Sequence, residues 1–249
     1  MANIELSRIG DIGVLTVNRP EVRNALDWDT MRGFSNMIKQ VHRDKKMRAL
    51  IVTGAGQTFV SGGDLKVLAN FPKRIHGLRL SRIMSRALDH LRALPMPTLA
   101  AINGPARGGG AEIAVACDIR IMAEDADIGF VHSKLGITTA WGGARFLLQL
   151  VGYPRALILL SKGSVLSAQE ADEIGLVDEV ASNGSVLDRA IQFAEELSQA
   201  PIEAVEAAKR LLRLAVAYPA VANLAESQIF ADLWDSEFRR EKVKRFLNK

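Results

Sequence analysis

Hydrophobic and polar residues follow two different periods along the chain, which predict strands and helices in turn. Residues 4–10 and 12–18 alternate with a period of two, which is typical of two strands joined by a turn. Residues 24–44 place apolar side chains three and four positions apart, which predicts an amphipathic helix. Short, continuously apolar runs at 48–56 and 97–104 predict buried strands.

The alternation of strands and helices continues to about Ser185. The further predicted elements are helices over 77–94, 109–118 and 141–152, the last ending at Gly152, and extended segments over 119–125 and 126–131. Strands that alternate with helices in this way are typical of an α/β fold with largely parallel pairing. Beyond Ser185 the patterns are helical only, so we divide the chain into a core of residues 1–190 and a helical region of residues 191–249.

The composition places the chain among globular proteins with a substantial core. Of its 249 residues, 48% are hydrophobic and 24% are charged, with a net charge of +4. No stretch approaches the roughly 18 uncharged apolar residues of a membrane helix, and the N-terminus lacks the apolar core of a signal peptide. We therefore expect a cytoplasmic protein without a membrane partner. The single cysteine, Cys117, lies in an apolar run that favours core packing, and the four scattered histidines show no metal-ligand spacing.

Two glycine-rich loops each follow a predicted buried strand. In residues 103–118, NGPARGGGAEIAVACD, three consecutive glycines precede a helical run that carries Glu112 among alanines and valines. In residues 58–68, TFVSGGDLKVL, two glycines precede Asp64 and a second helical run. Glycines at such junctions let the backbone approach a ligand, and two loops can supply one amide each to a carbonyl oxygen that gains negative charge. Neither loop reads GxGxxG, the dinucleotide-binding pattern.

Segments across nearly the whole chain resemble the crotonase superfamily, also called the enoyl-CoA hydratase/isomerase family. The matching segments are, in order, NRPEVRNAL, TFVSGGDL, INGPARGGGAEIAVACDIRI, LGITTAWGGARFLLQLVG and SAQEADEIGLVDEV. The resemblance implies a spiral of β-β-α units, a helical C-terminal trimerisation region, and a homotrimer or a dimer of trimers. It also implies a coenzyme A thioester as substrate, with no separate cofactor and no metal. By position, the two backbone amides that bind the thioester carbonyl and stabilise an enolate belong to Gly63 and Gly109.

The resemblance also suggests where coenzyme A lies. Arg23 and the backbone around Ala25 and Leu26 fall where family members hold the nucleotide, and we extend this assignment to Lys66. A cation near these positions suits the phosphates of coenzyme A. Asp64 either fixes its glycine loop or contacts the substrate.

The residues expected to act on the reacting carbons depart from one branch of the family. Hydratases of this family use two glutamates, and Glu112 matches the first. Alignment on Gly136 and on the glycine pair 142–143 places His132 at the position of the second. The pattern FVH…GI…WGG resembles instead the ethylmalonyl-CoA decarboxylases of the same superfamily. Decarboxylation yields an enolate without a base; Trp141 can supply the apolar wall it needs, and His132 or Glu112 can orient the carboxylate or protonate the enolate.

We therefore predict an acyl-CoA lyase that acts through an enolate, and we favour decarboxylation of a malonyl-type thioester. Hydration of a 2-enoyl thioester is the alternative, and double-bond isomerisation is a third reading because one glutamate can move a proton between two carbons. A non-catalytic, RNA-binding role is a fourth, since some family members bind RNA. Aromatic residues make up only 6% of the chain and form no basic-aromatic platform, which argues against a nucleic-acid partner.

Overall fold

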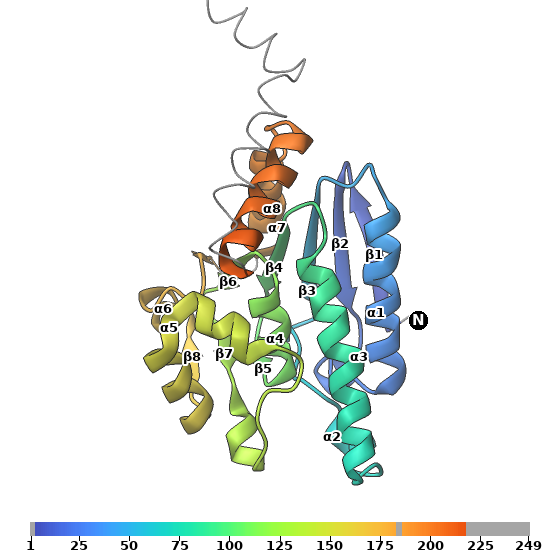
Figure 1. Cartoon of the computed structure of the whole chain (residues 1–249), viewed down its shortest axis with the longest axis vertical. Coiled ribbons are helices and arrows are strands. Elements are labelled where there is room, and N and C mark those ends of the chain that lie inside the picture. Colours follow the sequence, from blue (N-terminus) through green and yellow to red (C-terminus); the bar gives the residue numbers. More distant parts are fainter. Residues whose placement is uncertain (1–2, 183–185, 218–249) are drawn as a thin grey trace, which may run out of the picture.

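The computed structural model describes residues 3–182 and 186–217, and a six-stranded sheet forms its centre (Figure 1). The strands, in sheet order, are β1 (Ile4–Ile9), β2 (Ile12–Val17), β3 (Ala49–Gly54), β4 (Thr98–Ile102), β6 (Ile119–Ala123) and β9 (Glu179–Ala181). β1 and β2 form an antiparallel hairpin, and every later neighbour pairs in parallel. The predicted α/β fold with largely parallel pairing is confirmed.

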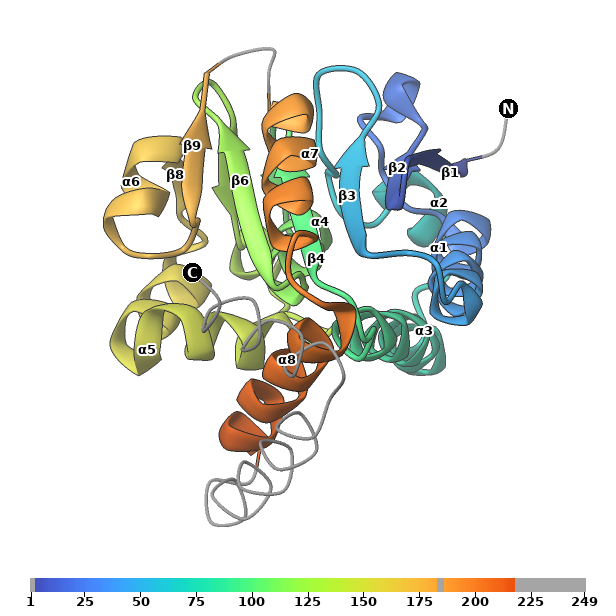
Figure 2. The same ribbon diagram turned by 90° about the horizontal axis from the view of Figure 1, so that it is seen from above.

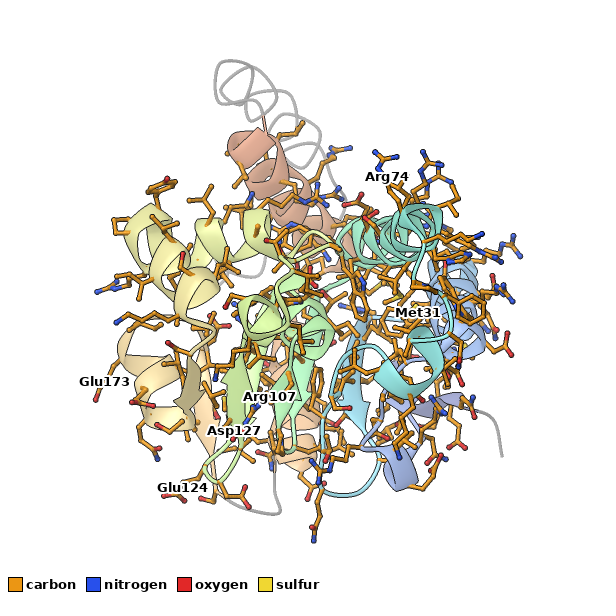
Figure 3. The ribbon with its side chains drawn as sticks, turned by 90° about the horizontal axis from the view of Figure 1, so that it is seen from below. Met31, Arg74, Arg107, Glu124, Asp127 and Glu173 are labelled. Carbon is orange, nitrogen blue, oxygen red and sulfur yellow. The ribbon has the colours of Figure 1, made fainter. Side chains whose placement is uncertain are left out.

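A second, three-stranded sheet lies beside the first. Its strands, in order, are β5 (Ala106–Arg107), β7 (Asp127–Gly129) and β8 (Val165–Ser167). β5 and β7 are parallel, and an ion pair joins Arg107 to Asp127 across them, as Figure 3 shows. The hydrophobic pattern did not predict β5, β8 or β9, because strands of two or three residues are too short to display a period.

Helices cover the main sheet and connect its strands. The longer ones are α1 (Trp28–Arg43), α3 (Arg74–Arg92), α4 (Gly109–Ala116), α5 (Gly143–Lys162), α7 (Val186–Leu197) and α8 (Ile202–Ala217); the short ones are α2 (Leu65–Leu68), α6 (Ala168–Glu173), η1 (Pro20–Val22) and η2 (Val131–Leu135). α1 packs on α3, and α4 contacts α3, α5 and β4. α7 lies on the main sheet against β2, β3, β4 and β6 (Figure 2).

The helix predicted over 24–44 shows how the sequence pattern produces an element. Asp27 caps α1 by accepting a 2.8 Å hydrogen bond from the Thr30 amide, which satisfies one of the free donors of the first turn. The apolar positions spaced three and four residues apart then form one buried face, which consists of Met31, Phe34, Ile38 and Val41.

The prediction that a helix ends at Gly152 is confirmed, because Gly152 breaks the helical geometry with φ 74° and ψ 169°. The sequence analysis did not predict the second helical segment, which begins at once and continues α5 to Lys162. Pro154 explains the restart, because proline fits the first turn of a helix. By length and composition alone, with a mean hydropathy of 1.2, α5 is the one helix within residues 3–182 and 186–217 that could cross a membrane. It packs on α4 and η2.

The predicted boundary at residue 190 falls inside α7, which packs on the sheet. The part of the predicted helical region beyond residue 217 lies outside the described residues. The division into a core and an oligomerisation region therefore stays a prediction, as does trimerisation.

Candidate active site

The two glycine loops identified from the sequence lie against each other. Isolated parallel bridges join Leu26 to Gly63 and Val60 to Ala106, and the Arg107 amide donates a 3.0 Å hydrogen bond to the Val60 carbonyl. A Cβ atom added at Gly62 would lie 3.2 Å from the Gly109 nitrogen. Backbone hydrogen bonding thus joins the two loops, and they meet at glycines, where neither loop has a side chain.

Among the described residues, the amides of Gly63 and Gly109 have no hydrogen-bond acceptor. In the bridge to Leu26, the flanking groups make the hydrogen bonds: Leu26 donates to the Gly62 carbonyl at 2.8 Å, and Asp64 donates to the Leu26 carbonyl at 2.9 Å. Gly109 is the first residue of α4, and first-turn amides have no acceptor inside their helix. Within the described part of the chain neither amide donates a hydrogen bond, and both residues line one cavity.

This cavity has a volume of about 180 Å³ and is bounded by both glycine loops, the start of α4, η2 and residues 137–141. Most of the side chains in its walls are apolar. Glu112 and His132 are the two ionisable side chains among the described residues that line it. Any proton transfer in this space therefore involves one of these two groups or a water molecule.

The side chain of Glu112 is only 1% exposed, and three hydrogen bonds hold it in one position. Its Oε1 atom accepts from the Trp141 amide at 2.8 Å and from the Gly143 amide at 3.0 Å. Its Oε2 atom lies 3.1 Å from Nε2 of His132. A Cβ atom added at Gly143 would overlap the Glu112 side chain, so glycine is needed for this close approach. The carboxylate is thereby oriented with one oxygen committed to the backbone and the other to the imidazole.

His132 lies in η2 and is buried against the start of α4. A hydrogen bond between its Nε2 and Oε2 of Glu112 requires one hydrogen between the two atoms, so the two side chains act on protons as a pair. Its Nδ1 atom is buried and has no hydrogen-bond partner among the described residues. Buried polar atoms usually have partners, and those without one often belong to functional sites.

Comparisons with known proteins show the family of this chain. A sequence model of the enoyl-CoA hydratase/isomerase family matches residues 8–249. The chain belongs to this family. The resemblance to the crotonase superfamily stated from the sequence is confirmed, and the chain is a member of an enzyme family whose substrates are acyl-CoA thioesters.

Similar members of the family are named for different activities. The chain is 34% identical to the short-chain-enoyl-CoA hydratase of Clostridium acetobutylicum, over 99% of this chain and 95% of that protein. It is 31% identical to the ethylmalonyl-CoA decarboxylase of Gallus gallus, over 94% of this chain and 80% of that protein. The structure of an enoyl-CoA hydratase from Bacillus anthracis superimposes with a TM-score of 0.94 at 30% identity, covering 99% and 96% of the two chains. These similarities confirm the crotonase-like fold.

Five residues predicted to bind substrate do not line the cavity described above. Arg23 is exposed with a left-handed φ of 55°, Ala25 and Leu26 are buried, and Lys66 is exposed on α2. Their role in holding the nucleotide of coenzyme A stays a prediction. Asp64 caps α2 by accepting a hydrogen bond from the Val67 amide at 3.3 Å, which favours the loop-fixing interpretation of this residue. Trp141, by contrast, lines the cavity.

Two residues that sequence reasoning missed fix the glycine loop of residues 58–68. Arg19 forms ion pairs with Asp27 at 3.2 Å and with Asp64 at 3.4 Å. Asn24 is fully buried, and its side-chain amide donates to the carbonyls of Ala55, Thr58 and Phe59. Both lie in the segment NRPEVRNAL, which carries part of the family resemblance, but the sequence analysis gave neither residue a role.

Within residues 3–182 and 186–217, no group of three or more histidine, cysteine, aspartate or glutamate side chains is placed to hold a metal ion. The expectation that the reaction needs no metal and no separate cofactor stays a prediction.

Proposed function

We propose that this protein decarboxylates a 2-alkylmalonyl-CoA thioester, with ethylmalonyl-CoA as the first substrate to test. The observation that carries the proposal is the contact between Glu112 and His132. The hydratases that the sequence resembles need two carboxylates, whereas the one carboxylate that lines the cavity among the described residues, Glu112, is paired with an imidazole at 3.1 Å. The relatives named ethylmalonyl-CoA decarboxylase, among them the one from Gallus gallus, add support.

The first step breaks the bond between carbon 2 and the free carboxylate. The electron pair of that bond moves into a double bond between carbon 2 and the thioester carbon, carbon dioxide departs, and the negative charge moves to the thioester oxygen. The amides of Gly63 and Gly109 donate to this oxygen in the proposal. One such donor is typically worth about 10²–10³ in rate, so the pair supplies a large part of the acceleration.

The second step places a proton on carbon 2 and yields a saturated acyl-CoA. The Glu112–His132 pair delivers this proton and recovers one from solvent, so the overall reaction consumes one proton. A hydrogen bond between the two groups keeps the donor directed into the cavity. Proton transfer from a positioned side chain contributes about 10²–10⁴ in rate.

The apolar walls of the cavity favour the same chemistry. Leu68, Leu80 and Ala140 line it and keep water from the departing carboxylate. Water strongly solvates a carboxylate but not carbon dioxide. A dry pocket therefore destabilises the reactant carboxylate relative to the product carbon dioxide.

Hydration of a 2-enoyl-CoA is the second candidate, because the short-chain-enoyl-CoA hydratase of Clostridium acetobutylicum matches over 99% of the chain. Hydration requires an attacking water held by a base and a proton delivered to the neighbouring carbon. Oε1 of Glu112 already accepts two amide hydrogens, so the carboxylate can hold that water only at Oε2, beside His132. This arrangement favours decarboxylation as the primary activity.

The test is a parallel assay of one enzyme preparation. Ethylmalonyl-CoA is supplied and carbon dioxide release and butyryl-CoA formation are measured; crotonyl-CoA is supplied separately and its hydration is followed. We expect equal amounts of carbon dioxide and butyryl-CoA, and a kcat/KM for ethylmalonyl-CoA above that for crotonyl-CoA. Rapid hydration without carbon dioxide release would replace decarboxylation with hydration as the function.

A further inference from the structure

The indole ring of Trp141 lies against the Cα atom of Gly109, whose amide is one of the two proposed to bind the thioester. Trp141 is 3% exposed, and a Cβ atom added at Gly109 would overlap the six-membered part of its ring. The ring therefore covers the Cα atom of Gly109. Its backbone is fixed independently, because the Trp141 amide donates to Oε1 of Glu112 at 2.8 Å. The backbone at position 141 is thus held by the same contact that orients the carboxylate.

Bond geometry brings the acyl chain to this ring. A thioester oxygen that accepts from the Gly109 amide lies about 3 Å from its nitrogen. Carbon 2 is only two bonds from that oxygen, and the alkyl substituent begins at carbon 2. The first carbons of the substituent therefore lie beside the residue that covers Gly109, which is Trp141.

The size of the cavity limits what can fit between the ring and the opposite wall. Its volume is about 180 Å³, and an engineered apolar cavity of about 150 Å³ in another protein holds one benzene molecule. The space thus suits an acyl group of a few carbons. Apolar side chains, among them Leu68 and Leu80, complete the wall on which an acyl group would pack.

We propose that Trp141 sets the upper limit on acyl chain length and restricts this protein to short-chain thioesters. The inference rests on the proposed function in that it places the thioester oxygen at Gly63 and Gly109. It does not depend on whether the bound thioester is then decarboxylated or hydrated. A smaller side chain at position 141 would open the cavity and leave the backbone contact to Glu112 in place.

Binding of saturated acyl-CoA thioesters tests this inference separately from catalysis, since these compounds have no carboxylate to lose and no double bond to hydrate. Dissociation constants for butyryl-, hexanoyl- and octanoyl-CoA are measured by calorimetry on the full chain. The variants are Trp141→Leu and the milder Trp141→Phe, which guards against a folding defect in the first. Trp28→Leu is the matched control, because Trp28 packs on Phe71 with ring centroids 5.6 Å apart and does not line the cavity.

We expect the unchanged protein and Trp28→Leu to bind butyryl-CoA more tightly than octanoyl-CoA. One methylene in a hydrophobic pocket is worth about tenfold or more, so Trp141→Leu is expected to shift the octanoyl-to-butyryl ratio by at least about tenfold, and Trp141→Phe by less. An unchanged ratio in both Trp141 variants, or equal binding of both thioesters by the unchanged protein, overturns the inference. Normal chain-length selection in a protein that releases no carbon dioxide from ethylmalonyl-CoA would sustain it and refute the proposed function alone.

Discussion

Oε2 of Glu112 and Nε2 of His132 lie 3.1 Å apart in the wall of the cavity that Gly63 and Gly109 also line. The two side chains are 20 positions apart in sequence and come from α4 and η2. Two backbone amides hold the other oxygen of the carboxylate, so the pair has a single arrangement. A carboxylate–imidazole pair of this kind is suited to delivering one proton, which is what an enolate requires after loss of carbon dioxide.

Replacement of Glu112 by glutamine separates proton transfer from structure. The glutamine oxygen can accept from the amides of Trp141 and Gly143, and its nitrogen can donate to His132, so the geometry is retained. We expect kcat for carbon dioxide release to fall about 10²–10⁴-fold with an unchanged Tm. Steady-state kinetics and a thermal melt check this, and a loss of less than tenfold would show that Glu112 takes no part in proton transfer.

Replacement of His132 by glutamate restores the pair of carboxylates that the family's hydratases use. We expect hydration of crotonyl-CoA to rise and butyryl-CoA formation from ethylmalonyl-CoA to fall, each by about 10²-fold, because the pair can then hold a water but has lost its imidazole. His132→Gln is the control, and we expect it to lower decarboxylation of ethylmalonyl-CoA without raising hydration of crotonyl-CoA. Undiminished decarboxylation in His132→Glu would contradict the role given to the imidazole.

The contact between Gly109 and Trp141 can be tested by a double-mutant cycle. Gly109→Ala forces a methyl group into the indole ring, and we expect it to lower the free energy of unfolding by about 1–3 kcal/mol. The cost is expected to be smaller when Trp141→Leu is already present, because the ring is gone. Gly77→Ala is the control, since nothing lies within 4 Å of a Cβ atom there. Equal costs in both backgrounds, measured by urea unfolding, would disprove the contact.

Cys117 was predicted to pack in the core, and it is buried there. Burial raises the pKa of its thiol from an ordinary 9.0 to about 12. The folded state thus holds this proton more tightly than the unfolded state, so the thiol's contribution to stability is complete below pH 9 and is lost as the pH rises through about 12.

We therefore expect the difference in unfolding free energy between the unchanged protein and Cys117→Ala to fall between pH 9 and pH 12. We also expect slow reaction with a disulfide reagent at pH 8 until urea is added, because the thiolate is the reactive form. Rapid labelling of the folded protein would refute the burial of this thiol.

Local signals predicted the parts of the site that depend on neighbours in sequence. Glycines at a junction between a strand and a helix mark a close backbone approach, and a carboxylate in the first turn of an apolar helix stands out, so both glycine loops and Glu112 were singled out. The family resemblance then assigned the two amides to Gly63 and Gly109. His132 has no such signal, and only alignment with the family motif drew attention to it. Its contact with Glu112 arises from tertiary structure and could not be derived from either segment alone.

The features that the sequence did not predict depend on distant partners or on competing local signals. The side-chain amide of Asn24 donates hydrogen bonds to carbonyls more than 30 positions away in the sequence. Arg19 contacts Asp64, which is 45 positions away. Gly152 ends one helical segment, as predicted, but Pro154 signals the beginning of the next, and this second segment, which continues α5 to Lys162, was not predicted.

The proposed mechanism requires that the amides of Gly63 and Gly109 bind the same thioester oxygen. A crystal structure with butyryl-CoA, the saturated product, tests it most directly. We predict the thioester oxygen about 2.7–3.1 Å from both amide nitrogens, with carbon 2 beside Glu112 and His132. A thioester oxygen bound elsewhere, or in contact with only one of the two amides, would contradict the account.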